Sequence, residues 1–238
     1  MKNLTIGIVA EGPSDFMLLE QLINSLLEGE YDYIRLHPET KFGVRERGWQ
    51  GVRAWCQMVA TEFESLAIFL NGATPTLDLL VIHIDADVAS TINCEHPCPP
   101  AQDSCDAIAQ CLINWLGNPS TQEPLVLCIP AQNTEAWVLA ADNPKTKSPY
   151  HNPPEKYLEC VPSPDMIISS QGYQPHPLLK RKRKKENGRK VKKANKNAKD
   201  YAKLIPNVLE NWEYVKRLCP QAAKFEQDLK EHALIKIG

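Results

Sequence analysis

The stretch Val9-Ala10-Glu11-Gly12-Pro13-Ser14-Asp15 decides the fold, because a buried strand ends and a helix begins within it. The run 4–10 is short, apolar and rich in β-branched residues, which is typical of a buried parallel strand. Apolar residues then recur at helical spacing up to residue 27. Gly12 is expected to permit a sharp turn between the two elements. The two acids of this stretch either cap the helix or lie at the carboxyl edge of a sheet, where α/β folds build their sites.

The first 142 residues continue this alternation of strands and helices. Apolar runs predict strands at 31–36, 77–84 and 125–129, and amphipathic patterns predict helices at 49–69, 101–116 and 133–141. Hydrophobic residues make up 43% of the chain, enough for a sizeable core. Residues 1–142 are therefore predicted to form a Rossmann-like α/β domain, with a mostly parallel sheet flanked by helices.

The remaining residues divide by composition. Residues 143–179 contain eight prolines, which predicts an irregular connector. Residues 180–203 form a basic arm with 13 Lys and Arg against two acidic residues, which leaves a formal charge of −13 on the rest of the chain. Residues 204–238 are predicted to be a helical tail, with breaks near Pro206 and Pro220, that docks on the α/β domain.

The sequence also bears on location and on the cysteines. No apolar run reaches the roughly 20 residues of a membrane span, and the N-terminus has no signal-peptide pattern. A soluble cytoplasmic protein without membrane contact is expected, with its eight cysteines reduced. Cys94, His96 and Cys98 have the ligand chemistry of a zinc site. Their spacing matches no regular zinc motif, so free thiols are the preferred interpretation.

A second pair of acids follows the most apolar strand. Asp85 and Asp87 are two residues apart, which in an extended chain turns both side chains to one side. If that strand neighbours the first, they meet Glu11 and Asp15 at one sheet edge, and Glu135 joins them from the next strand. Clustered carboxylates repel one another unless a cation lies among them, and their oxygens suit Mg²⁺ or Mn²⁺. Two such ions can promote phosphodiester hydrolysis. The alternative is that Asp85 and Asp87 only cap a loop.

Glu11-Gly12-Pro13-Ser14-Asp15 and Asp85-Ala86-Asp87 together resemble the TOPRIM domain, which topoisomerases, bacterial primases, recombination proteins and OLD-family nucleases share. The second acid, four residues after Glu11, resembles the OLD type. Asn133-Thr134-Glu135-Ala136-Trp137 is similar to a motif of small stand-alone bacterial TOPRIM-like proteins. The resemblance covers residues 4–142. It implies a metal-dependent site in which the two pairs of acids bind Mg²⁺ and Glu11 also transfers a proton.

The resemblance implies further features. OLD-type nucleases use a lysine beyond their acidic motifs, for which Lys199 and Lys203 are the candidates. The chain has no G-x-x-x-x-G-K-[ST] motif and therefore lacks the ATPase that accompanies the OLD nuclease. By family analogy, the expected setting is bacterial defence, with a possible partner protein; the oligomeric state is left open.

The basic arm suits a nucleic-acid substrate, because clustered cations attract the phosphates of DNA or RNA regardless of sequence. A segment of this composition is expected to be disordered until bound. The predicted nucleic-acid ligands in the arm are Lys180, Arg181, Lys182, Arg183, Lys184, Lys185, Arg189, Lys190, Lys192 and Lys193. Arg45 and Arg47 are candidates for a second phosphate contact, although a solvated loop is the simpler interpretation for them. For the arm, a solvated linker is the alternative.

Two other classes of protein have acidic residues in comparable positions. A phosphoacceptor receiver domain also gathers carboxylates at strand ends, but its acidic pair follows the first strand and a lone Asp comes later. In this chain that count is inverted, because the pair Asp85 and Asp87 follows a later strand. A non-catalytic nucleic-acid-binding module with structural Mg²⁺ would use the same residues as a nuclease. We expect a metal-dependent nuclease, with that module as the alternative. His83 is expected to face away from the acids as a core residue.

Overall fold

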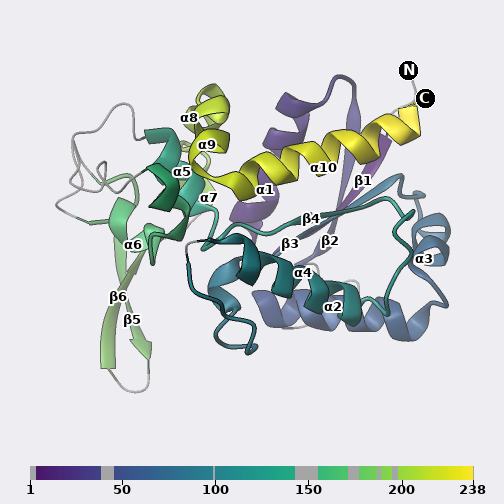
Figure 1. Cartoon of the computed structure of the whole chain (residues 1–238), viewed down its shortest axis with the longest axis horizontal. Coiled ribbons are helices and arrows are strands. Elements are labelled where there is room, and N and C mark those ends of the chain that lie inside the picture. The colour runs from purple at the N-terminus through teal and green to yellow at the C-terminus, as the bar shows by residue number, and fades with distance from the viewer. Residues whose placement is uncertain are drawn as a thin grey trace.

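A four-stranded, fully parallel sheet forms the centre of the protein. The computed structural model describes residues 4–38, 46–98, 100–142, 155–170, 177–186, 189–194 and 198–237. The strands are β1 (Leu4–Val9), β2 (Tyr31–His37), β3 (Leu79–His83) and β4 (Leu125–Cys128), in the spatial order β2-β1-β3-β4 (Figure 1). The predicted α/β fold with a parallel sheet is confirmed.

Helices cover both faces of this sheet (Figure 1). One face carries α1 (Pro13–Leu26) and α10 (Pro220–Ile237), and α5 (Glu135–Asp142) belongs to the same hydrophobic cluster. The other face carries α2 (Trp49–Glu62), α3 (Leu66–Gly72) and α4 (Gln102–Trp115). Side chains alternate along the strands, so Leu79 and Val81 join the first hydrophobic cluster while Leu80 and Ile82 join the second. Burial on both faces explains why β3 is apolar from Leu79 to Ile82.

The two central strands are direct neighbours. The register pairs Ile8 with Val81 and Val9 with Ile82, so β1 and β3 end at nearly the same level. The segments that follow them therefore emerge together at the carboxyl edge of the sheet. This adjacency was the condition for the two pairs of acids to meet, and it is confirmed.

The long helix predicted over 49–69 is wrong in one respect, because α2 ends at Glu62 and α3 begins at Leu66. Ser65 caps the second helix, since its hydroxyl accepts a hydrogen bond from the backbone N–H of Ile68 at 3.2 Å. An apolar face that continues in register conceals such a break. The signal for it was the polar pair Glu64-Ser65.

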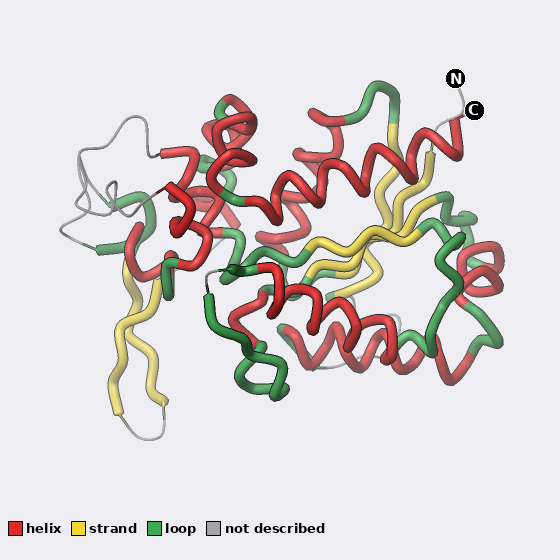
Figure 2. The backbone as a smooth tube through the Cα atoms, in the orientation of Figure 1, coloured by secondary structure: helices red, strands yellow, loops and turns green. Residues whose placement is uncertain are grey.

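The basic segment forms a two-stranded antiparallel sheet of β5 (Arg181–Glu186) and β6 (Arg189–Ala194), which projects away from the body (Figure 2). The sequence had predicted no regular structure here until a ligand binds, and that prediction is wrong. Asn-Gly at 187–188 was the missed signal, since this dipeptide is the one most typical of two-residue hairpin loops. Arg181 fixes the base of the hairpin by donating to the carbonyl oxygen of Met166 at 3.0 Å.

Short helices connect the hairpin to the sheet. Before the hairpin lie a 3-10 turn (Glu155–Cys160) and α6 (Pro164–Ile168), and after it lie α7 (Ala198–Tyr201), α8 (Ile205–Glu210) and α9 (Trp212–Leu218). These elements share one core with the sheet, in which Trp137 of α5 packs edge-on against Trp212 at 5.5 Å between ring centroids. The C-terminal helices are thus part of the main hydrophobic core.

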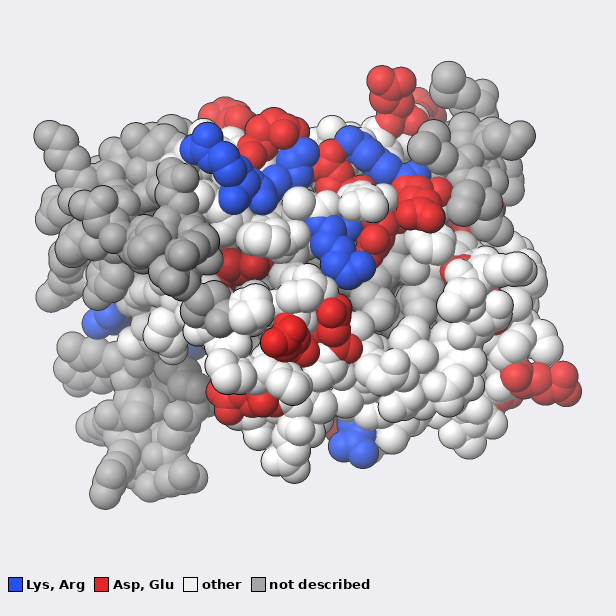
Figure 3. Space-filling model, in the orientation of Figure 1, with Lys and Arg blue, Asp and Glu red and all other residues white. Residues whose placement is uncertain are grey.

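The outer face of α10 is polar. In Figure 3, basic and acidic side chains lie side by side along the upper part of the molecule, where this helix runs. They include the pairs Lys224–Asp228 and Lys230–Glu226, both with i,i+4 spacing. Every helix among the described residues is too short or too polar to span a membrane.

Candidate active site

The structure brings Glu11 and Asp85 into direct contact at the carboxyl edge of the sheet. Oε1 of Glu11, just beyond β1, accepts a hydrogen bond from the backbone N–H of Asp85, just beyond β3, at 2.9 Å. Asp85 as a whole residue is only 7% exposed. Burial and the neighbouring charge of Asp85 raise the pKa of Glu11 to about 8. In this arrangement, without a cation, Glu11 therefore holds a proton at neutral pH.

His83 lies against the same acids, so the prediction that it faces away from them is wrong. Its Nε2 atom is 3.3 Å from Oδ1 of Asp85, and the imidazole is completely buried. Burial alone would lower the pKa of His83, but contact with the Asp85 carboxylate raises it to about 9. Residues 83 and 85 are two apart in an extended stretch and so share a side, which was the signal available in the sequence.

A chain of buried hydroxyl groups reaches the second acid, Asp15 in the first turn of α1. Oγ1 of Thr134 donates to Oδ1 of Asp15 at 3.2 Å and lies 3.0 Å from the hydroxyl oxygen of Tyr201. Thr134 and Tyr201 are fully buried, and Asp15 is 7% exposed. Burial, followed by the charges of Glu135 and Asp15, raises the pKa of Tyr201 well above its usual value. The tyrosine hydroxyl is therefore protonated, and sequence reasoning had missed this residue altogether.

Two glycines give the acids room. A Cβ atom at Gly12 would lie 3.3 Å from Oδ2 of Asp15, and one at Gly48 would lie 3.5 Å from Oε2 of Glu11. The backbone of Gly12 is extended (φ −152°), so this glycine serves the close approach of Asp15 rather than a sharp turn. Gly48, at the start of α2, has φ +63°, a conformation that favours glycine. The exposed Arg47 directly precedes Gly48, the residue that borders Glu11.

Asp87 differs from Asp85 in its surroundings. Residues 86–88 form a 3-10 turn, so the extended geometry predicted for the two acids ends at Asp85. Asp87 is exposed and borders a cavity of about 760 Å³, which is also lined by Ser90, His96 and Gln132. Its backbone N–H donates to the carbonyl oxygen of Gln132 at 2.9 Å, which joins the two loops that follow β3 and β4. Asp87 therefore lies on the solvent side of the cluster.

The donor atoms at this edge suit a hard divalent cation. They are carboxylate oxygens, and Oδ1 of Asn133 is a further buried oxygen with no hydrogen-bond partner among the described residues. Glu135 is completely buried at the start of α5. Within the described part of the chain, however, no three His, Cys, Asp or Glu side chains are placed to bind one metal ion together. The donor chemistry fits Mg²⁺ or Mn²⁺, and shared coordination requires side-chain rotation.

The remaining predicted residues lie outside this cluster. Lys203 pairs with Asp200, with Nζ 3.4 Å from Oδ1, and Lys199 is exposed on α7. Lys180 and Lys182 are exposed at the base of the hairpin, whereas Arg181 is bound to α6. For the hairpin residues 183–185, 189, 190, 192 and 193 the structure describes only the backbone, and Arg45 lies outside the described residues.

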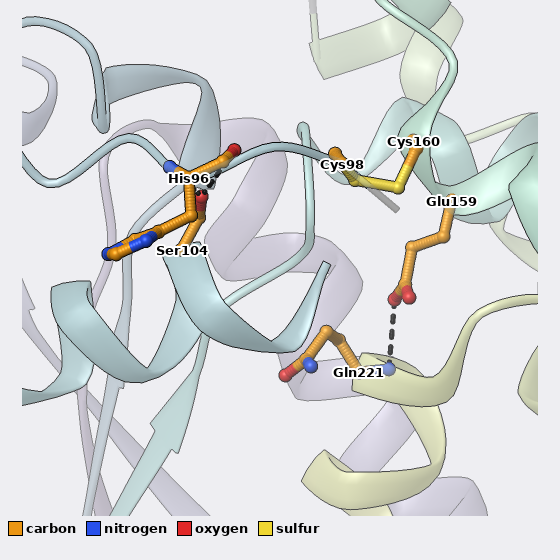
Figure 4. The surroundings of a disulfide bond; sticks show 6 residues. All are labelled: His96, Cys98, Ser104, Glu159, Cys160 and Gln221. Carbon is orange, nitrogen blue, oxygen red and sulfur yellow. Dashed lines mark hydrogen bonds between the residues drawn. A yellow bond between two sulfur atoms is a disulfide. The ribbon is translucent and has the colours of Figure 1, made fainter. Parts of the chain in front are cut away.

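The cysteine loop after β3 is fastened to the body (Figure 4). Cys98 forms a disulfide with Cys160, so the prediction of reduced thiols is wrong for this pair. The fold brings together two segments 62 residues apart, which sequence spacing could not reveal. Beside the disulfide, the carboxylate of Glu159 accepts from the backbone N–H of Gln221 at 2.8 Å (Figure 4). Burial raises the pKa of Glu159 to about 7.

Two of the three candidate zinc ligands, Cys94 and Cys98, have sulfur partners. Cys98 is oxidised, and Sγ of Cys94 lies 3.2 Å from Sγ of Cys111. The backbone of His96 exchanges hydrogen bonds with the hydroxyl of Ser104 (Figure 4).

Comparisons with protein-family models, with curated proteins and with solved structures found no match to this chain.

Proposed function

We propose that this protein is a divalent-metal-dependent nuclease of the TOPRIM type that hydrolyses phosphodiester bonds of DNA or RNA. The observation that carries the proposal is the contact between Glu11 and the backbone of Asp85 at the shared edge of β1 and β3. It joins the two acidic motifs that carry the resemblance to TOPRIM. The strand order around them, with β1 and β3 in the centre of a parallel sheet, supports the same assignment.

Mg²⁺ or Mn²⁺ would be held by the carboxylates of Glu11, Asp15, Asp85 and Asp87. The buried Glu135 is the fifth candidate ligand. When bound, the ion would supply a polarised phosphate oxygen and a water of lowered pKa. The resemblance to TOPRIM implies that Glu11 would also transfer a proton; without a cation, burial and the charge of Asp85 raise the pKa of this carboxyl to about 8. His83 would orient the Asp85 carboxylate, because its Nε2 atom lies 3.3 Å from Oδ1 of Asp85. The low exposure of Asp15 and Asp85 keeps bulk water from competing for their oxygens.

The hairpin would supply the affinity for the nucleic-acid backbone. Its register places basic residues opposite one another in three pairs, Lys182 with Lys193, Arg183 with Lys192 and Lys185 with Lys190. Like charges at directly opposed positions destabilise a two-stranded sheet. A bound polyanion removes that repulsion and gains the electrostatic energy of counterion release. The composition of this hairpin is thus explained by a phosphate-rich ligand. Defence against mobile DNA, with a partner protein, is the setting that the family analogy suggests.

The test is cleavage of supercoiled plasmid and of single-stranded RNA with Mg²⁺ or Mn²⁺, by the wild type and by Asp85→Asn. Asp103→Asn, which changes an exposed acid on α4, is the matched control. We expect the wild type and the control to cleave, and Asp85→Asn to lose at least a hundredfold in rate while it still binds. Binding without cleavage by all three proteins would contradict the nuclease and support a non-catalytic module.

A further inference from the structure

We infer that Tyr201 is a positioning residue of the carboxylate site, which acts through Thr134 on Asp15. This inference rests on the proposed metal-dependent function. Tyr201 belongs to α7, directly after the basic hairpin, whereas Thr134 precedes α5 and Asp15 begins α1. Three segments distant in sequence therefore meet in a single line of hydrogen bonds.

The direction of this line follows from the donors available. A threonine hydroxyl has one proton, and Thr134 donates it to Oδ1 of Asp15 at 3.2 Å. In the 3.0 Å contact between the two hydroxyls, Tyr201 must then be the donor and Thr134 the acceptor. Each bond polarises the next, which strengthens the hydrogen bond to the carboxylate in this buried site. Asp15 is thereby held as an acceptor in one orientation.

Local structure alone does not account for the position of the Thr134 hydroxyl. Thr134 immediately precedes α5, where a threonine side chain ordinarily accepts a backbone N–H of the first helical turn. Within the described residues, its hydroxyl hydrogen-bonds only to Asp15 and Tyr201. The backbone carbonyl of Thr134 does accept the N–H of Trp137, so the residue is correctly placed for capping. Its side chain instead contacts a carboxylate of the site.

The C-terminal region contributes a residue to the acidic site. The resemblance to TOPRIM ends at residue 142, whereas Tyr201 lies in the C-terminal region and is completely buried. Partners of this kind, which fix the orientation of a metal-binding side chain, typically change metal affinity 10–100-fold when removed. The segment that follows the basic hairpin is thus built into the acidic site.

The test compares Mn²⁺ affinity, measured by titration calorimetry on the full-length chain. Thr134→Val removes the hydroxyl with little change in shape, Tyr201→Phe removes only the phenolic oxygen, and Thr134→Ser restores the relay. We expect Thr134→Val to weaken Mn²⁺ binding by about tenfold, Tyr201→Phe to weaken it by about threefold, and Thr134→Ser to bind as the wild type does. The double variant should match Thr134→Val, because the tyrosine acts only through the threonine.

The control is Tyr33→Phe, since the hydroxyl of Tyr33 donates to Asn24 at the surface. Nucleic-acid affinity without metal should be the same in all variants. A merely structural role would lower the thermal stability of Tyr201→Phe and leave its Mn²⁺ affinity at the wild-type value, and that result overturns the inference. A wild type that binds no Mn²⁺ overturns the proposed metal site and, with it, the positioning role. The two failures are thus distinguished by the wild-type titration.

Discussion

Replacement of Glu11 by glutamine should stabilise the protein while it abolishes function. Glu11 is buried beside Asp85, and its pKa rises from 4.5 to about 8 on folding. Below pH 4.5 the carboxyl is protonated in both the folded and the unfolded chain, so it does not affect the free energy of unfolding. As the pH rises, the unfolded chain ionises first, which favours unfolding until the folded carboxyl also ionises near pH 8.

The magnitude follows from this interval. At pH 7 the folded protein must keep Glu11 protonated, which costs about 3 kcal/mol relative to the ionised unfolded chain. The glutamine side chain does not ionise in this pH range, and its amide oxygen can still accept a hydrogen bond from the backbone N–H of Asp85. We therefore expect Glu11→Gln to unfold with the same free energy as the wild type at pH 4 and with about 3 kcal/mol more at pH 7.

The assay is urea denaturation of both proteins from pH 4 to pH 8.5 without divalent metal. Glu30→Gln, at an exposed position before β2, is the matched control and should follow the wild type throughout. His83 also loses stabilising energy as the pH rises toward 9, but it does so in both proteins. A stability difference that does not grow with pH, or a less stable Glu11→Gln at pH 7, would refute the reasoning.

Three further outcomes are expected. The disulfide Cys98–Cys160 closes a loop of 62 residues, so Cys98→Ser should lower the unfolding free energy by about 4 kcal/mol, and dithiothreitol should do the same only to the wild type. Trp212→Phe removes the 2.7 Å bond from the indole N–H to the buried Glu226 carboxylate, and should cost about 2 kcal/mol in urea unfolding; a wild-type midpoint would contradict this. Substitution of Lys190, Lys192 and Lys193 by glutamine should weaken DNA binding and reduce the slope of log affinity against log salt by about one per lysine, whereas an unchanged slope would remove the hairpin from the interface.

The sequence by itself determined the α/β class, the strands and most helices of residues 4–142, and the acids at the strand ends. Local patterns suffice for these features, because burial on both faces of a parallel strand requires an apolar run such as residues 79–82. The sequence placed Glu11 and Asp85 at the carboxyl edge of the sheet, since parallel strands end at one edge, but their contact depended on β1 and β3 being neighbours. The dipeptide Asn187-Gly188 could also have predicted the hairpin. The two-residue spacing of His83 and Asp85 could have predicted that both side chains lie on the same side.

Only the tertiary structure decided the contacts between segments distant in sequence. No local pattern links Tyr201 to Thr134, which are 67 residues apart, or Cys98 to Cys160. The pKa of Glu11 is likewise a tertiary property, because burial and the charge of Asp85 arise only when β1 and β3 lie side by side. Hydrogen bonds, disulfides and charge interactions depend on distances in space, and the sequence specifies those distances only through the complete packed fold.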